Sequence, residues 1–399
     1  MSWMHFNCTR EHPLADGLVP ARLAGSAMPQ TIEQLVERIH ASQGRVVIVS
    51  SGGGGRAIAD LMEVPGASRT LLEAVVPYSE AAMVAWLGGR PDKFCAPRTA
   101  RAMAMTAFLK ACRYGDDNST LAGIACTAGL VSNRPKRGAH RAHLALQTAR
   151  VTATWSLQLE KGRRSRVEEE RLVSRLVLNA VAEACQVDAR LELELVEGER
   201  IEQSRTEAQP AWQDLLLGKV ETVARGERHA GAIFPGAFNP LHVGHRRMVE
   251  IAEAVLEVPV AREISILNVD KPPLDYFEID RRLAQFEPDE TVWLTRAATF
   301  EEKSRMFPGT TFIVGVDTLR RIAAPRYYHE DAEACHAALA RIAARGCRFL
   351  VFARDAGTGL MRLADLDLPE TLRAICCEIP PEQFREDVSS TEIRRSGAW

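Results

Sequence analysis

The chain alternates short apolar runs with amphipathic helical patterns in two separate series, and this alternation limits its possible folds more than any other feature. The first series covers residues 30–185 and the second residues 229–399. The pattern predicts two α/β domains, of which the second has a parallel sheet with its ligands at the carboxyl ends of the strands. A length of 399 residues agrees with this division, because one hydrophobic core rarely serves so long a chain.

Two stretches fall outside these series. Residues 1–29 show no regular pattern and predict an irregular lead-in, whereas residues 186–228 are polar with mixed charge and predict a connector with some local structure. The chain starts without the basic and apolar segments of a signal peptide, and no apolar run approaches the roughly 20 residues that span a bilayer. We therefore expect a cytoplasmic protein without a membrane partner.

Composition excludes further classes of partner. The formal net charge of −2 gives no bulk attraction to nucleic acid, so any anion binding has to be local. The nine cysteines lack the paired spacing of a zinc site, and we expect reduced thiols and no metal held by cysteine or histidine.

The segment FPGAFNPLHVGH, residues 234–245, ends an apolar strand and begins a helical pattern. The first amides of a helix are free donors at the positive end of its dipole, so this junction predicts an anion site. Gly236 lets the backbone come close to a ligand, and Gly244 removes a side chain between two histidines. His242 and His245 are three residues apart, which on a helix places both imidazoles on one face.

A second candidate element is EDVSSTEIRR, residues 386–395. Ser389, Ser390 and Thr391 offer hydroxyl and backbone donors at an expected helix start. Arg394 falls on the same side of that helix as Ser390, where its guanidinium suits phosphate oxygens. Together the two elements predict one binding site for a triphosphate.

GAFNPLHVGH combined with SSTEIR resembles the HxGH nucleotidylyltransferase superfamily, particularly nicotinamide or nicotinate mononucleotide adenylyltransferases, over residues 229–399. The resemblance implies a Rossmann-like parallel-sheet domain that binds ATP with Mg²⁺, transfers AMP to a mononucleotide and releases pyrophosphate. It implies catalytic roles for His242, His245 and Arg394. The nucleotide-binding residues that it implies are Phe234, Gly236, Ala237, Phe238, Asn239, Gly244, Ser389, Ser390 and Thr391.

The acceptor side is less defined. The segment FIVGVDTL is similar to a strand and acidic turn of the same superfamily, which implies Asp317 near the acceptor, and VFARD places Arg354 after a late strand. Lys271 is a further candidate for contact with the acceptor. From the residues alone, Asp317 also suits a helix cap and Lys271 a solvated side chain.

Three functions stay open at this point. The first is the adenylyl transfer just described, and the second is transfer to another phosphorylated acceptor, as in the cytidylyl or phosphopantetheine branches. The third is a non-catalytic nucleotide sensor, although both histidines are intact. A class I tRNA synthetase also uses an HxGH element, but EEKSRM is a poor match to its lysine-rich loop.

The first series contains VSSGGGGRAIADLMEV, AVVPYSEAA and LAGIACTAGL. These segments resemble the C-terminal domain of competence-damage-inducible protein A, the nicotinamide mononucleotide amidohydrolase family, over about residues 30–185. The resemblance implies an amidohydrolase-like α/β domain, a homo-oligomer, and a site containing Ser51, Tyr78 and Ser79. Met83 stands where that family has lysine, and Ala122 where it has threonine.

A serine without a basic partner has no means of activation, so we predict a domain that lacks amidase activity. Anion binding could persist, because residues 52–55 are glycines that lead into a helix, and Arg134 and Arg137 flank a proline turn.

Overall fold

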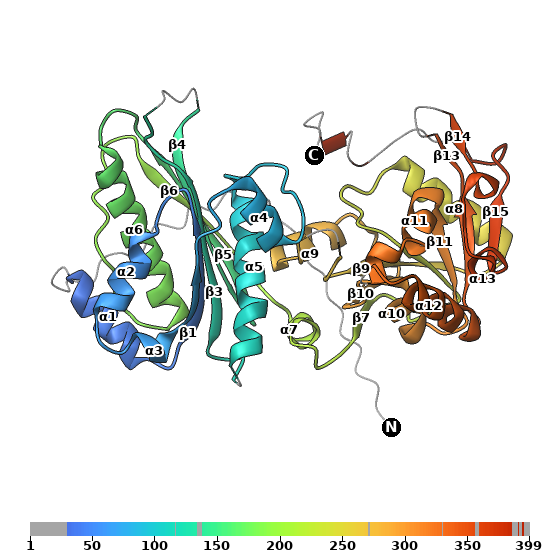
Figure 1. The fold of residues 1–399 in the computed structure, drawn as a ribbon, viewed down its shortest axis with the longest axis horizontal. Coiled ribbons are helices and arrows are strands. Elements are labelled where there is room, and N and C mark those ends of the chain that lie inside the picture. Colours follow the sequence, from blue (N-terminus) through green and yellow to red (C-terminus); the bar gives the residue numbers. More distant parts are fainter. Residues whose placement is uncertain are drawn as a thin grey trace.

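The computed structural model describes residues 30–115, 117–133, 138–269, 272–328, 330–355 and 359–384, with residues 390, 393 and 394. The expected lead-in, residues 1–29, lies outside them. The described residues form two large sheets, each covered by helices, which lie side by side in an elongated molecule (Figure 1).

The first sheet has six strands in the order β2-β1-β3-β4-β5-β6. Its strands are β1 (Arg45–Ser51), β2 (Leu71–Val75), β3 (Leu121–Gly129), β4 (His140–Thr148), β5 (Val151–Leu159) and β6 (Arg200–Glu207). β1 pairs in parallel with β2 and β3, whereas β3, β4, β5 and β6 pair in antiparallel fashion. The sheet is therefore mixed.

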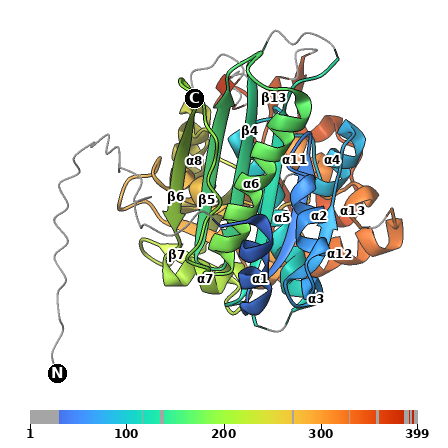
Figure 2. The ribbon, with the colours of Figure 1, turned by 90° about the vertical axis from the view of Figure 1, so that its left-hand side faces the viewer.

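Helices cover both faces of this sheet. They are α1 (Ile32–Ala41), α2 (Arg56–Glu63), α3 (Ala67–Thr70), α4 (Glu80–Leu87), α5 (Pro97–Tyr114) and α6 (Arg166–Ala184). Figure 2 shows α1, α2 and α6 across the outer face, and α4 and α5 lie on the face toward the second sheet (Figure 1). Because both faces are buried, β1 is apolar at Val46 and Ile48 on one side and at Val47 and Val49 on the other.

Gly123 on β3 allows α5 to pack closely against the sheet. A Cβ at this position would lie 2.1 Å from the carbonyl oxygen of Ala104 and 2.3 Å from the backbone nitrogen of Phe108. Any larger residue would push α5 outward, so this glycine serves helix packing.

The second sheet has seven strands in the order β15-β12-β11-β8-β9-β10-β7. They are β7 (Thr222–Arg225), β8 (Ala232–Pro235), β9 (Val260–Ser265), β10 (Val292–Thr295), β11 (Thr311–Gly315), β12 (Arg348–Phe352) and β15 (Cys376–Ile379). All pairs are parallel except that of β7 with β10. The chain runs outward from β8 to β9 and β10, and then returns to β11 on the other side. The carboxyl ends of β8 and β11 therefore form the topological switch point, where α/β sheets bind ligands.

The second sheet is also covered on both faces. Its helices are α7 (Pro210–Leu216), α8 (Val243–Leu256), α9 (Tyr276–Leu283), α10 (Phe300–Met306), α11 (Val316–Ile322), α12 (Ala332–Ala344) and α13 (Glu370–Arg373). Residues of α8 and α9 pack on one face, and residues of α11, α12 and α13 pack on the other. A short hairpin, β13 (Arg354–Asp355) with β14 (Leu360–Met361), follows β12.

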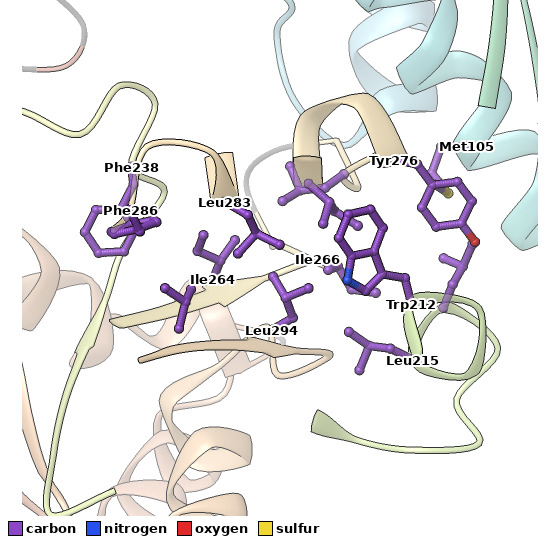
Figure 3. Packing of buried hydrophobic residues seen from close by; sticks show 14 of the residues in the cluster. Met105, Trp212, Leu215, Phe238, Ile264, Ile266, Tyr276, Leu283, Phe286 and Leu294 are labelled. Carbon is purple, nitrogen blue, oxygen red and sulfur yellow. The ribbon is translucent and has the colours of Figure 1, made fainter. Parts of the chain in front are cut away.

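The two halves share one continuous apolar cluster. It extends from Met105 on α5 through Tyr276 and Trp212 to Ile264 and Phe238 in the second half (Figure 3). Tyr276 is fully buried, and its ring stacks on that of Trp212 with a centroid distance of 6.4 Å. The contact between the halves therefore has the character of a hydrophobic core.

Residues 186–228, which the sequence predicts as a connector, contribute a strand to each sheet. β6 pairs with β5, and β7 pairs with β10. β6 is an edge strand whose side chains are almost all exposed and polar, so it lacks the apolar alternation that indicates a strand in sequence.

Candidate functional site

The turn that follows β8 carries the first sequence motif. Phe238 has a positive φ of 41° and is almost fully buried, and its ring lies over Gly236. A Cβ on Gly236 would lie 2.6 Å from Cζ of that ring. The chain therefore needs glycine here to accommodate Phe238, whereas the sequence suggested that the glycine makes room for a ligand.

The two motif histidines lie against each other at the start of α8. His242 is the N-cap of that helix in extended conformation, so only His245 is a helical residue. Their ring centroids are 3.6 Å apart, and the ring planes are inclined by 26°. The backbone N–H of His242 donates to Nδ1 of His245 at 3.2 Å. Neutral His245 consequently carries its proton on Nε2, which makes Nε2–H a donor.

Both imidazoles are neutral at pH 7. Burial lowers the pKa of His245 to about 3, with further lowering by His242 and Arg354. Its ring contacts Phe234 and Phe238 at centroid distances of 5.8 and 5.2 Å, which explains the loss of hydration. Burial also lowers the pKa of His242, again with a contribution from Arg354. Nδ1 of His242 is buried and has no hydrogen-bond partner within the described part of the chain.

The C-terminal motif lies against the same turn. The hydroxyl of Ser390 donates to the carbonyl of Pro240 at 3.0 Å, and Nη1 of Arg394 donates to the carbonyl of Asn239 at 2.6 Å. These bonds join segments that are about 150 positions apart in the sequence, and Pro240 lies only two residues before His242. Ser389 and Thr391 lie outside the described residues.

The acceptor candidates lie on the neighbouring strand ends. Asp317 is in the first turn of α11, after β11, and its carboxylate accepts from Nη1 of Arg354 at 2.9 Å. The N-cap of α11 is Gly315, so Asp317 does not cap this helix. Because β8, β11 and β12 are parallel, Asp317 after β11 and Arg354 after β12 lie at the same edge of the sheet as the turn after β8, and Arg354 also lowers the pKa of both histidines. Lys271 lies outside the described residues.

In the first half, two of the three candidate residues have structural partners. The hydroxyl of Ser51 donates to the carbonyl of Pro77 at 3.0 Å, and the hydroxyl of Ser79 caps α4 by accepting from the amide of Ala82. Tyr78 is 71% exposed. Met83, at the position of the expected lysine, is buried in the core.

The helix start after the glycine run is occupied by the chain itself. The amide of Arg56, the first residue of α2, donates to the carboxylate of Glu170 on α6 at 3.2 Å. A Cβ on Gly52 would lie 2.0 Å from the carbonyl of Ala128, so close packing explains that glycine. At this helix start the carboxylate of Glu170 thus binds one of the amides that could otherwise bind an anion. Arg134 and Arg137 lie outside the described residues.

Comparison with known families accounts for both halves of the chain. Residues 233–396 match the family described as cytidylyltransferase-like, and residues 29–178 match the CinA C-terminal domain. The chain joins a CinA C-terminal domain to a cytidylyltransferase-like domain. The cytidylyltransferase-like match indicates a nucleotidyltransferase. No curated protein shows significant similarity to the chain.

Several solved structures are similar to the CinA domain. One is the competence/damage inducible protein CihA from Agrobacterium tumefaciens, with 21% identity over 41% of this chain and 100% of that chain and a TM-score of 0.30. A CinA superfamily protein from Escherichia coli has 18% identity over 39% and 90%, with a TM-score of 0.30. One from Enterobacter cloacae has 16% identity over 41% and 97%, with a TM-score of 0.32.

Helix α9 supports the turn after β8 in the cytidylyltransferase-like domain. No sequence pattern predicted this support. Arg282 donates to the carbonyl of Ala237 at 3.0 Å, and Arg281 donates to the side-chain oxygen of Asn239 at 2.6 Å. Gln285, just beyond the helix, donates to the carbonyl of Phe238 at 2.8 Å and accepts from the amide of Leu241 at 2.7 Å. The only sequence signal was the polar face of EIDRRLAQF, which is equally typical of a solvated helix.

No group of three or more His, Cys, Asp or Glu side chains among the described residues is arranged to hold a metal ion. None of the described helices is both long and apolar enough to cross a membrane.

Proposed function

We propose that the cytidylyltransferase-like domain transfers AMP from ATP to a nicotinamide-type mononucleotide and releases pyrophosphate. The observation that carries the proposal is the joining of the two motifs on one turn, where Ser390 and Arg394 bind the carbonyls of Pro240 and Asn239. The turn lies at the switch point of a parallel sheet and leads into a helix start, which is where such sheets bind phosphates.

In this reaction an oxygen of the acceptor phosphate attacks the α-phosphorus, and the bond from that phosphorus to the β-phosphate oxygen breaks. The protein contributes positioning and charge stabilisation, since no covalent intermediate is needed. Nε2–H of neutral His245 is a preorganised donor for the phosphate oxygens, and Arg394 supplies positive charge on the same turn. Mg²⁺ is expected to enter with the triphosphate as part of the substrate, since it is usually held largely by substrate phosphates and water.

A nicotinamide-type acceptor is favoured by the resemblance of both halves to families that handle such mononucleotides. Asp317 and Arg354, paired at 2.9 Å after neighbouring parallel strands, are the groups that we expect to contact an acceptor. A second candidate is cytidylyl transfer from CTP, which the description of the matched family favours. A nucleotide sensor without catalysis is the third.

The proposal is tested by incubating the full chain with ATP or CTP, Mg²⁺ and one acceptor at a time, with pyrophosphate release as the readout. The acceptors are nicotinamide mononucleotide, nicotinate mononucleotide and phosphopantetheine. We expect release with ATP and a nicotinamide-type acceptor. Release only with CTP or only with phosphopantetheine would replace this assignment, and binding of nucleotide without release in any mixture would support the sensor.

His245→Ala should lower the rate of pyrophosphate release by about 100-fold to 1,000-fold, the effect typical of removing one preorganised oxyanion donor. Arg247→Ala is the matched control on the same helix, because Arg247 is exposed and pairs only with Glu250 among the described side chains. Equal activity of the His245→Ala variant and the control would contradict a role for this imidazole in the reaction.

For the CinA domain we propose that amidase activity is absent. The hydroxyl of Ser51 is bonded to a backbone carbonyl, and the residue at the position of the family's lysine is the buried Met83. Incubation of the chain with nicotinamide mononucleotide should release no ammonia. Ammonia release that disappears in Ser51→Ala would overturn this expectation.

A further inference from the structure

Helix α9 lies between the CinA domain and the turn that carries the histidines. It begins at the contact between the two domains and ends beside Gln285, which holds that turn (Figure 1). One short helix therefore contacts both the neighbouring domain and the candidate nucleotide site.

Two arginines of the CinA domain bind the first turn of α9. Both lie on α5. Nε of Arg101 donates to the N-cap Asp275 at 3.0 Å, and Nη2 of Arg98 donates to Glu278 at 3.0 Å. Arg101 also reaches Glu278 at 3.4 Å and packs over the ring of Phe277. Asp275 and Glu278 are almost completely buried, so both carboxylates are shielded from solvent, and Arg101 is largely buried with them.

Tyr276, near the start of the same helix, fixes it against the CinA domain. The hydroxyl of Tyr276 donates to the carbonyl of Ala149 at 2.7 Å, and its amide donates to the hydroxyl of Thr152 at 3.2 Å. Figure 3 shows the Tyr276 ring between Met105 and Trp212. The start of α9 is thus held by buried hydrogen bonds and by packing.

The charges on α9 continue to the turn. Glu278 binds Arg281 at 2.9 Å and Arg282 at 3.4 Å, and these two arginines donate to Asn239 and Ala237. Burial by itself would raise the pKa of Glu278, but the surrounding arginines hold the pKa below its usual value. One carboxylate therefore orients arginines from both domains.

We propose that Glu278 is a positioning residue through which the CinA domain holds the nucleotide turn in place. The inference assumes from the proposed function only that this turn binds a nucleoside triphosphate. It gives the CinA domain a role that needs no chemistry of its own, since Arg98 and Arg101 fix α9, and α9 fixes the backbone from Ala237 to Leu241.

Two readouts test this proposal in the full chain. The first is backbone hydrogen exchange over residues 236–245, which requires no ligand, and the second is the dissociation constant for ATP measured by calorimetry. In the double variant Arg98→Ala/Arg101→Ala we expect faster exchange in the turn and a dissociation constant raised about tenfold, within the range measured for coupling through packed networks. Glu278→Gln should act in the same direction.

Controls separate positioning from general loss of stability. Arg113→Ala, an exposed position on α5, should leave the exchange of the turn unchanged. Arg98→Lys/Arg101→Lys should restore most of the ATP affinity, because the charges remain. If the double alanine variant fails to fold, Arg98→Ala alone serves, since the side chain of Arg98 is 41% exposed.

The outcomes are distinct. Unchanged exchange in the turn together with unchanged ATP affinity in the folded double variant would overturn the positioning role while leaving the proposed function intact. Exchange that rises equally over the whole cytidylyltransferase-like domain would also overturn it, because the effect would then be general. If the wild type binds neither ATP nor CTP, the proposed function fails, and exchange in the turn alone decides the positioning role.

Discussion

At the scale of single residues, burial and the backbone amide of His242 set the chemistry of His245. Phe234 and Phe238 remove water from the ring, and the amide fixes the tautomer. A neutral donor in a dry position needs no reorganisation when negative charge develops on a phosphate. The two motif histidines, His242 and His245, can be identified from the sequence. The N-cap position of His242 cannot, because it depends on the irregular turn from Gly236 to Leu241.

The shifted pKa of His245 makes stability depend on pH. In the unfolded chain its pKa is about 6.5 and in the fold about 3, so as pH falls the unfolded state takes up the proton first. The contribution of neutral His245 to the free energy of unfolding is therefore fully present above pH ~6.5 and is lost as pH falls toward ~3. We expect the difference in unfolding free energy between pH 7 and pH 5 to shrink by about 2 kcal/mol in His245→Asn.

Chemical denaturation at the two pH values measures this effect. His336→Asn, on the exposed side of α12, is the matched control and should behave like the wild type. The same pH dependence in His245→Asn and in the wild type would show that His245 does not titrate as its surroundings require.

At the scale of elements, prediction succeeded where apolar periodicity was strong and failed where tertiary contacts decide. β1, α5 and α6 follow their sequence patterns closely. The run EISILNV, residues 263–269, reads as a strand, but β9 spans Val260–Ser265. The run LRAICCEI, residues 372–379, also reads as a strand, but only Cys376–Ile379 form β15, and its start belongs to the helical turn α13. The failure is physical, since Leu372 is fully buried in a helical turn as readily as in a strand.

The same limit applies to the candidate site. Both motifs were recognisable in the sequence, but their contact depends on Arg394 reaching a carbonyl 155 residues away. The support from Arg281, Arg282 and Gln285 was invisible, because Arg282 and Gln285 bind backbone carbonyls of an irregular turn and Arg281 binds the side chain of Asn239 in that turn. Sequence patterns report side-chain types, whereas this site is held together largely by main-chain acceptors.

Gly236 allows a test of how tightly the Phe238 ring packs in the turn after β8. In Gly236→Ala the new Cβ would lie 2.6 Å from the Phe238 ring, which packs edge-on against Phe286 and His245. We expect the variant to lose about 1–3 kcal/mol of stability, as is typical of overpacking, and to bind ATP more weakly because the ring must move.

Thermal unfolding and calorimetric titration with ATP are the measurements for this variant. Gly231→Ala is the matched control before β8, since the nearest atom to its new Cβ is 3.7 Å away and its backbone is unstrained. Equal stability and equal ATP affinity in both variants would mean that the Phe238 ring is not fixed in the turn.

At the scale of the whole molecule, one apolar cluster crosses from the CinA domain to the cytidylyltransferase-like domain. Because most separate domains meet through more polar surfaces, this apolar contact predicts that the two halves unfold together. No sequence pattern indicates this contact, since its residues lie on α5, α7 and α9, where their apolar side chains look like those of ordinary amphipathic helices.

Tyr276 is the residue to test this cooperativity, because it is fully buried between the domains. Tyr276→Phe removes only the hydrogen bond to Ala149 and should cost about 1 kcal/mol, whereas Tyr276→Ala opens a cavity and should cost about 3–5 kcal/mol. In scanning calorimetry we expect one transition for the wild type and Tyr276→Phe, and two for Tyr276→Ala as the domains lose their common core. Tyr78→Ala, at a side chain that is 71% exposed, should unfold like the wild type. Two separate transitions already in the wild type would mean that the shared cluster does not couple the domains, and the influence of α5 on the nucleotide turn would then have to pass through the Arg98 and Arg101 ion pairs alone.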